Sequence, residues 1–324
     1  MENGENDFYR AKEVYSMWQY YLMVVLATML FSIQFVFTKC YQKEKGSTFF
    51  YSTIFSAVAC FAAIPFFLIL NKGKVEFTWF SFAIACLYSI DVLLCSVFGA
   101  KTLSRANLSV YSLFLMLGGM LLPFLYGLAI GEKLTVFKGI AVTCILLAIL
   151  FTLKKGEQKK VDWLTMVCFL LIFVTNGLSG VLTYIHQRSM ENIVSASGFL
   201  LLTNGVSCTL SSLLALGIFL YGKKKSPTIL ELHGAERGNC EKSRLKSWLF
   251  AIGFIVGYAL LHGTAALLTT ITASYVDASV QSTIITGGCM LMSAIFGLFF
   301  KEKVTKRTVV SLLFAIVGTV CIMF

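Results

Sequence analysis

The chain of 324 residues is 57% hydrophobic and only 13% charged, with a mean hydropathy of +0.81 and a formal net charge of +11. Soluble domains usually carry about 25% charged residues, so this composition excludes an ordinary soluble globular protein and places the chain in the membrane class. Nearly all of the charges lie in short breaks between long apolar runs.

These apolar runs follow one another along the whole chain. A helix needs about 20 residues to cross the hydrocarbon core of a bilayer, whereas a barrel strand needs about 9–11. The run lengths therefore predict an all-α integral membrane protein with ten transmembrane helices, at about 19–38, 48–70, 79–100, 108–130, 136–153, 162–185, 197–221, 248–271, 279–300 and 305–323. Only one break is long, the basic segment 222–247, so we expect no soluble catalytic domain. We also expect no nucleic-acid binding there, because Lys and Arg beside membrane spans usually set topology.

One unit of the chain occurs twice. Residues 107–135 and 277–305 align without a gap at an offset of 170, and eleven of the 29 pairs are identical. The identities include the polar break, where Glu132, Lys133 and Thr135 recur at the same places in the second copy. Apolar composition alone would match a few leucines but not this break, so the pattern indicates an internal repeat.

A second offset relates the first run of each copy. Residues 36–43 (VFTKCYQK) align with 181–188 (VLTYIHQR) at an offset of 145, with three identities. The chain therefore divides into two five-helix units, 1–155 and 156–324. Because five is odd, the second unit enters the membrane from the opposite side, and such inverted repeats commonly hold a substrate site at the bilayer midplane.

Asp91 is the one acidic residue near the middle of an apolar run. A charge at that depth costs roughly 2.5–3.5 kcal/mol on insertion scales, so such residues usually face the bundle interior and mark functional sites. We interpret Asp91 as a site for a substrate amine or a proton; the alternative is a protonated acid that is hydrogen-bonded between helices. His262 lies at the corresponding depth of the 248–271 run, where a structural hydrogen bond explains it as well as a binding role does.

Two tyrosines at equivalent positions of the repeat allow the positions of Asp91 and His262 to be compared. Tyr88 and Tyr258 match at the 170 offset; Asp91 follows the first by three residues and His262 follows the second by four. Both spacings put the pair on one helix face. We therefore expect the two sites to approach each other across a pseudo-twofold axis.

Uncharged polar residues inside the runs complete the predicted substrate site. Each alone is as easily explained by an interhelical hydrogen bond as by ligand binding. Together they indicate a cavity lined by the first, third, fourth, sixth, eighth and ninth runs. These residues are Gln34, Asn176, Tyr111, Ser112, Gln281 and Ser282.

Three short motifs resemble the drug/metabolite transporter superfamily in its ten-helix EamA-like branch. The stretch FSIQFVFTK (31–39) resembles the first-span pattern of that family, Trp-Gly-x-Asn ending in Lys, with Gln34 at the Asn position. GEKLT (131–135) and KEKVT (301–305) resemble its Gly-Glu-Arg-Leu-Thr break. The chain departs from the family at Gly119 and Cys289, where a proline is common, so the substrate is less certain than the fold.

The resemblance implies a transporter that moves a small polar metabolite, such as an amino acid, by alternating access through a central cavity. Alternatives are a membrane receptor, an assembly factor or an exchanger of the nucleotide-sugar type. An enzyme would need a paired-acid set or a motif such as H-E-x-x-H, and the chain contains neither, so we expect no catalytic residue, no metal and no cofactor. The expected partners are a small-molecule substrate and the lipid bilayer of the plasma membrane, with proton coupling as an option, and the protein is expected to be a monomer or homodimer.

Orientation is left open by two opposing arguments. The odd-numbered loops carry 20 of the 27 Lys and Arg residues, so the positive-inside rule puts both termini outside the cell. The family resemblance implies that both termini are cytoplasmic.

Overall fold

The computed structural model describes residues 2–45, 48–105, 108–152, 163–189, 193–225, 241–299 and 306–321. Within these ranges every regular element is a helix and no strand occurs, which confirms the all-α prediction. The helices are α1 (Glu2–Lys45), α2 (Phe49–Leu70), α3 (Trp79–Arg105), α4 (Leu108–Ala129), α5 (Val136–Thr152), α6 (Trp163–Gln187), α7 (Ala196–Lys225), α9 (Glu241–Thr272), α10 (Ala278–Phe299) and α11 (Lys306–Cys321).

Six helices are long and apolar enough to cross a membrane. Their spans are Trp18–Gln42, Phe49–Leu70, Trp79–Gly99, Trp163–Gln187, Ala196–Tyr221 and Trp248–Thr272. Large apolar side chains such as Leu22, Phe61 and Leu170 stay exposed on the outside of these spans, as expected for surfaces that contact lipid. Trp79 and Trp163, each 78% exposed, begin two of the spans, the position that interfacial tryptophans prefer. The protein is therefore an integral membrane protein; the number of ten crossings stays a prediction.

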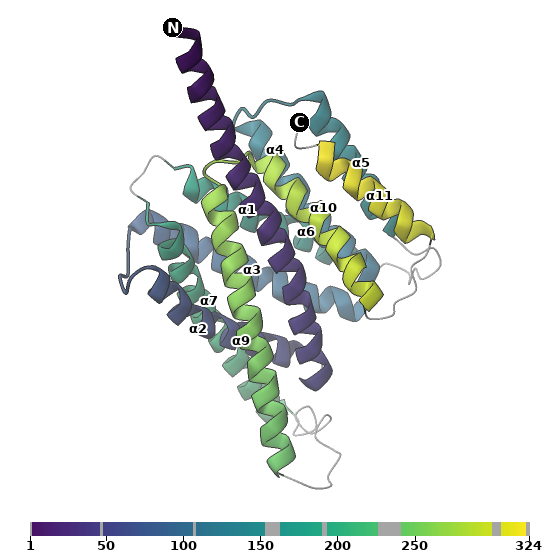
Figure 1. Ribbon diagram of the computed structural model, residues 1–324. Helices are drawn as coiled ribbons and strands as arrows, with labels where there is room; N and C mark the ends of the chain where they lie inside the picture. Colours follow the sequence, from purple (N-terminus) through teal and green to yellow (C-terminus); the bar gives the residue numbers. More distant parts are fainter. Residues whose placement is uncertain are drawn as a thin grey trace.

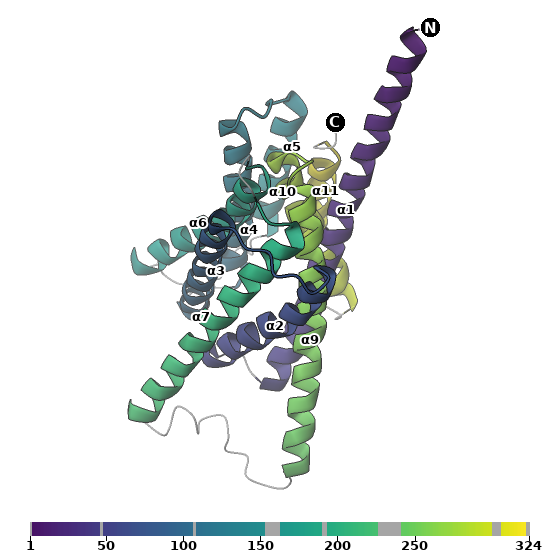
Figure 2. The same cartoon turned by 90° about the vertical axis from the view of Figure 1, so that its left-hand side faces the viewer.

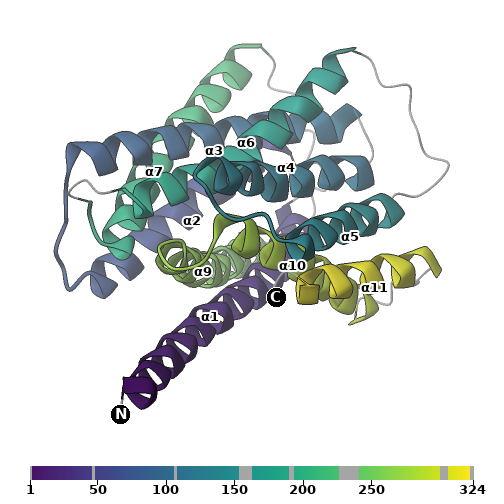
Figure 3. The same cartoon turned by 90° about the horizontal axis from the view of Figure 1, so that it is seen from above.

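The helices pack in pairs that join distant parts of the chain. Helix α1 crosses the front of the bundle in Figure 1 and packs against α9 and α10, while α6 packs against α3 and α4. Helix α2 lies along α7, and α4 along α10. Helices α5 and α11 lie side by side at one edge of the bundle, as Figure 3 shows from above. The beginning of α1 and the end of α11 lie at the same end of the molecule, which Figure 2 shows in the turned view.

The described helices agree with the two sequence offsets without testing them at every end. The described parts of α4 (108–129) and α10 (278–299) are offset by 170 residues, and the apolar span 18–42 within α1 is offset by 145 residues from the span 163–187 of α6. Residues 106–107, 153–162 and 300–305, next to several of these bounds, lie outside the described ranges. The inverted repeat stays a prediction.

Two glycines let helices of the bundle approach closely. A Cβ at Gly118 on α4 would collide with the backbone of Phe173 on α6, and a Cβ at Gly288 on α10 would meet the side chain of Thr28 on α1. Small residues at helix contacts are the usual means of close packing in membranes, because association there depends on van der Waals contact and not on exclusion of water. The two contacts are related by the same offsets, 170 for the glycines and 145 for their partners.

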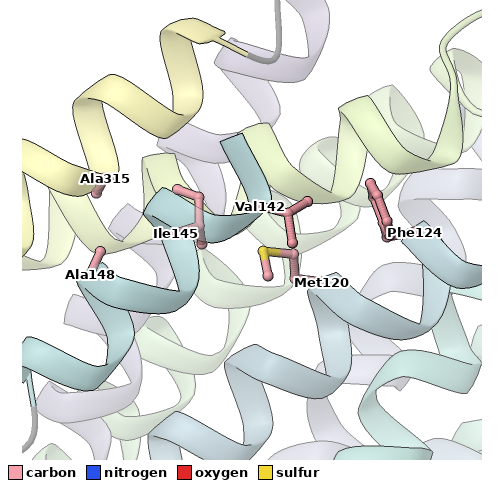
Figure 4. Close-up of a cluster of buried hydrophobic side chains, with 6 residues drawn as sticks. All are labelled: Met120, Phe124, Val142, Ile145, Ala148 and Ala315. Carbon is pink, nitrogen blue, oxygen red and sulfur yellow. The ribbon is translucent and has the colours of Figure 1, made fainter. Parts of the chain in front are cut away.

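One buried apolar cluster joins α4, α5 and α11. Figure 4 shows that its side chains point toward one another between these helices. Met120, Ile145, Ala148 and Ala315 are fully buried there, and Phe124 and Val142 nearly so. The cluster fixes α5 and α11 against α4, and so holds the loop between α4 and α5 over the end of the bundle.

Candidate functional site

Asp91 lies on α3 and is 3% exposed, so its carboxyl group is inside the bundle and does not face lipid. Its Oδ2 atom is buried and has no hydrogen-bond partner among the described residues. Tyr88 and Cys95 lie one turn to either side on the same helix face, and both are within electrostatic range of the carboxyl group. Asp91 is therefore a buried acid with an unused acceptor, a combination that is rare because burying such a group without a partner is unfavourable.

His262, on α9, is fully engaged. Its Nδ1–H donates to the Gln34 side-chain oxygen on α1 at 2.8 Å, which fixes the tautomer. Its ring stacks on Tyr258 with centroids 5.4 Å apart and lies 5.6 Å from the ring of Phe31. Gln34 and His262 thus form one interhelical pair, and the sequence had placed both in the substrate site without predicting that they bond to each other.

The two tyrosines each contact an aromatic ring of a neighbouring helix. Tyr88 meets Phe199 of α7 edge-on at 6.3 Å, and Tyr258 meets Phe55 of α2 edge-on at 4.7 Å. Asp91 and His262, which both lie in the described part of the chain, form no hydrogen bond or ion pair with each other. Their approach across a pseudo-twofold axis stays a prediction.

The remaining predicted site residues divide into two groups. The Asn176 side chain donates to the Leu115 carbonyl of α4 at 2.6 Å, and the Ser282 hydroxyl donates to the Met120 carbonyl of α4 at 3.5 Å, so both side chains serve helix packing here. The Gln281 side chain donates to the Thr269 carbonyl at 2.9 Å, but its own oxygen is buried without a partner. The side chains of Tyr111 and Ser112 lie outside the described residues. Whether these residues bind substrate stays a prediction.

A second set of polar contacts was not foreseen and lies in the loops. Glu132, in the break between α4 and α5, accepts hydrogen bonds from the backbone N–H of Ala278 at 2.7 Å and from the hydroxyl of Ser279 at 2.6 Å. These are the first residues of α10, where a carboxylate satisfies free N–H groups and the helix dipole. Glu132 thus caps α10, and its basic partner is Arg188 at 3.4 Å.

Arg188 follows α6 and holds the turn between α9 and α10. Its guanidinium donates to the carbonyl of Ala273 at 3.0 Å and to that of Val276 at 2.7 Å. The same turn carries Asp277, which pairs with Lys138 of α5 at 2.7 Å. The turn between α9 and α10 is thus held by Glu132 from the α4–α5 loop, by Lys138 from α5 and by Arg188 after α6.

The loop between α2 and α3 is tied to the loop between α6 and α7. Glu76 accepts a hydrogen bond from the Ser195 backbone N–H at 2.6 Å, which lowers the pKa of this carboxyl group below its ordinary value. The Asn71 side-chain oxygen accepts from the hydroxyl of Ser195 at 3.1 Å. Nearby, the His186 ring shares a hydrogen bond of 2.8 Å with the Ser81 hydroxyl. We call the whole set the polar loop network; its members are Asn71, Glu76, Ser81, Glu132, Lys138, His186, Arg188, Ser195 and Asp277.

Among the described residues, no group of three or more His, Cys, Asp or Glu side chains could hold a metal ion. The nine described cysteines are free thiols that are partly or fully buried. What the arrangement offers is a buried acid with an open acceptor inside the bundle, and a set of breakable polar contacts in the loops.

Comparison with known proteins gives the fold and not the function. No family model matches the chain, and no curated protein matches it. Solved structures do match, in 28 chains. One of them, described only as "Crystal structure of protein", superposes with a TM-score of 0.66 over 94% of this chain and 96% of its own, at 12% sequence identity. At this identity the likeness shows a shared arrangement of helices over nearly the whole chain.

Proposed function

We propose that the protein is a multi-pass transporter of a small polar metabolite that works by alternating access between its two units, residues 1–155 and 156–324. The observation that carries the proposal is the polar loop network. Glu76 with Ser195, Glu132 with Ser279 and Lys138 with Asp277 each join a residue of the first unit to one of the second. Alternating access needs contacts between the units that close one end of the site and can be broken.

The packing of the helices supports the inverted repeat on which this mechanism depends. If α1, α2, α3, α4 and α5 correspond to α6, α7, α9, α10 and α11, most contacts between the units have a mirror; the contact of α5 with α10 has no equal counterpart between α11 and α4. The pair α1 and α9 corresponds to α6 and α3, and the pair α1 and α10 corresponds to α6 and α4. The pairs α2–α7, α4–α10 and α5–α11 correspond to themselves. This is the pattern that a twofold axis would produce, and it agrees with the resemblance to EamA-like transporters.

The interior of the bundle supports a polar cargo. Asp91 and Gln281 each bury one oxygen atom that has no partner. Ionisable residues inside membrane spans commonly mark substrate or ion pathways. We propose Asp91 as part of the substrate site, in a protein with ten crossings of the plasma membrane, and keep proton coupling as part of the proposal.

An exchanger for nucleotide sugars is a weaker alternative. Its phosphate groups would need Lys or Arg side chains inside the bundle. Within the six apolar spans the only such residue is Lys39, close to the end of the first span. A receptor or assembly factor would not need contacts between the units that open and close.

The test is uptake by purified protein in proteoliposomes. The vesicles are incubated with a pooled mixture of amino acids, amines, organic acids and sugars, and their contents are measured by mass spectrometry over time. We expect at least one polar solute to accumulate faster than in protein-free vesicles. Equal contents in both sets of vesicles for every solute would contradict the proposal.

A further inference from the structure

The two related polar positions in the bundle differ in whether they are satisfied. In the second unit, His262 is hydrogen-bonded to Gln34 and stacked on Tyr258. In the first unit, the corresponding acid Asp91 has a buried Oδ2 atom without a partner. The described side chains of the bundle therefore hydrogen-bond His262 but leave one carboxyl oxygen of Asp91 without a partner.

The unpartnered oxygen of Asp91 is not explained by helix packing. Ser89, two residues earlier on α3, accepts a hydrogen bond from the Ser207 hydroxyl at 2.9 Å and donates to the Thr203 carbonyl at 3.1 Å. Polar groups of α3 that serve packing thus find partners on α7. Asp91 has neighbours on its own helix and an exposed fraction of 3%, yet its second oxygen is unused.

The electrostatics of the spans favour a positive charge beside Asp91. It is the only acidic residue in the six apolar spans, and those spans offer no Lys or Arg except Lys39. A carboxylate in this medium attracts a cation strongly and repels an anion, because the low dielectric screens neither effect. Apart from Lys39, no Lys or Arg side chain in these spans supplies the counter-charge, which a cationic ligand would supply.

An aromatic ring completes such a site. Tyr88 lies one turn from Asp91 on the same face of α3. The faces of tyrosine rings attract ammonium groups, and more strongly when the site is desolvated. A buried acid beside a tyrosine is a suitable receptor for a primary amine or a quaternary ammonium group.

We propose that Asp91, with Tyr88 beside it, binds the ammonium group of the transported solute, so that the substrate is a small organic cation. The inference rests on the proposed transport function. It narrows the substrate class from polar metabolites in general to amines and quaternary ammonium compounds. Asp91 supplies the charge, and Tyr88 supplies a ring face.

The test is ligand-induced thermal stabilisation of the detergent-purified full chain at fixed pH. The probes are choline, ethanolamine and phenethylamine, with 3,3-dimethylbutan-1-ol as the uncharged isostere of choline and succinate as an anion. We expect at least one cation to raise the melting temperature in a saturable way, while the isostere and succinate do not. Stabilisation by none of the three cations would overturn the inference.

Variants then assign the effect to the site. Asp91→Asn should weaken cation binding at least tenfold, and Glu44→Gln, which removes the same charge at the end of α1, should leave it unchanged. Tyr88→Phe, which keeps the ring face, should retain binding that Tyr88→Leu weakens. If Asp91→Asn fails to fold, the two Tyr88 variants provide the test: cation binding of equal affinity in Tyr88→Phe and Tyr88→Leu would overturn the inference. Wild-type affinity in Asp91→Asn would show that Asp91 is a proton site or a structural acid and would overturn the inference.

Uptake separates this inference from the proposed function. Transport of anionic or uncharged solutes only, at wild-type rates in Asp91→Asn, would leave the transporter standing and remove the cation site. Cation binding that depends on Asp91, without uptake of any solute, would support the cation site and contradict the proposed transport function.

Discussion

Glu132 is a loop residue whose carboxylate connects the two units of the chain. Its carboxylate is 5% exposed, caps α10 of the other unit and faces Arg188. Because charge-assisted hydrogen bonds contribute about 1.5–3 kcal/mol, Glu132→Gln should destabilise the protein by about that amount. The measurement is the melting temperature in detergent, with Lys133→Gln as a control that removes an exposed charge from the same break. A drop of equal size in both variants would contradict the role given to Glu132.

Glu76 gives a prediction on pH. Its pKa is lowered by the hydrogen bond from the Ser195 N–H, so the ionised form is favoured in the folded protein. The contact therefore stabilises the fold above the ordinary glutamate pKa of about 4.3, and this stability is lost as the pH falls through the lowered value. Wild type should melt higher than Glu76→Gln at pH 7, and the gap should close on acidification. A gap that stays constant from pH 7 to the acid limit would contradict this account.

At the scale of the elements, the close approach of α4 and α6 depends on Gly118. A Cβ there would strike the backbone of Phe173, which cannot move aside as a flexible side chain could. Gly118→Ala should therefore destabilise the protein by about 1–3 kcal/mol, the usual cost of overpacking. Gly205→Ala on α7 is the matched control, because a Cβ there meets nothing within 4 Å. Melting temperatures of the two variants decide the point; equal stability of the two would show that the helices can separate at no cost.

The sequence predicts helices well and contacts between them poorly. The apolar run at 108–130 became α4, Leu108–Ala129, because membrane helices are bounded by their own hydropathy and breaks. The partners of Glu132 could not be found in this way, since Ala278 and Ser279 are more than 140 residues away in the chain. The same holds for Asn176, whose amide serves the Leu115 carbonyl, a group that every residue type carries. Only the repeat gave information on distant contacts, through the offset shared by Gly118 and Gly288.

For the whole molecule, the repeat predicts a symmetry that an experimental structure can measure. Residues 79–153 should superpose on 248–323 after a rotation of about 180° about an axis in the membrane plane. Cryo-electron microscopy of the protein in a lipid nanodisc would give both the rotation and the number of crossings. An arrangement in which α4 and α10 bear no such relation would show that the sequence repeat does not extend to the fold.

Alternating access predicts that the loops of the two units must separate during transport. Asn71 and Ser195 belong to different units and are in contact at 3.1 Å, so a cysteine pair at these positions can be cross-linked by a short bifunctional thiol reagent. The background variant lacks the other cysteines and is first shown to retain uptake.

The most direct test of the account is therefore uptake by Asn71→Cys/Ser195→Cys proteoliposomes, measured by mass spectrometry before cross-linking, after it and after reduction. The account predicts solute accumulation before cross-linking, none while the link is present, and recovery on reduction, with each single-cysteine variant unaffected by the reagent. Accumulation that continues unchanged in the cross-linked protein would contradict alternating access through these two units.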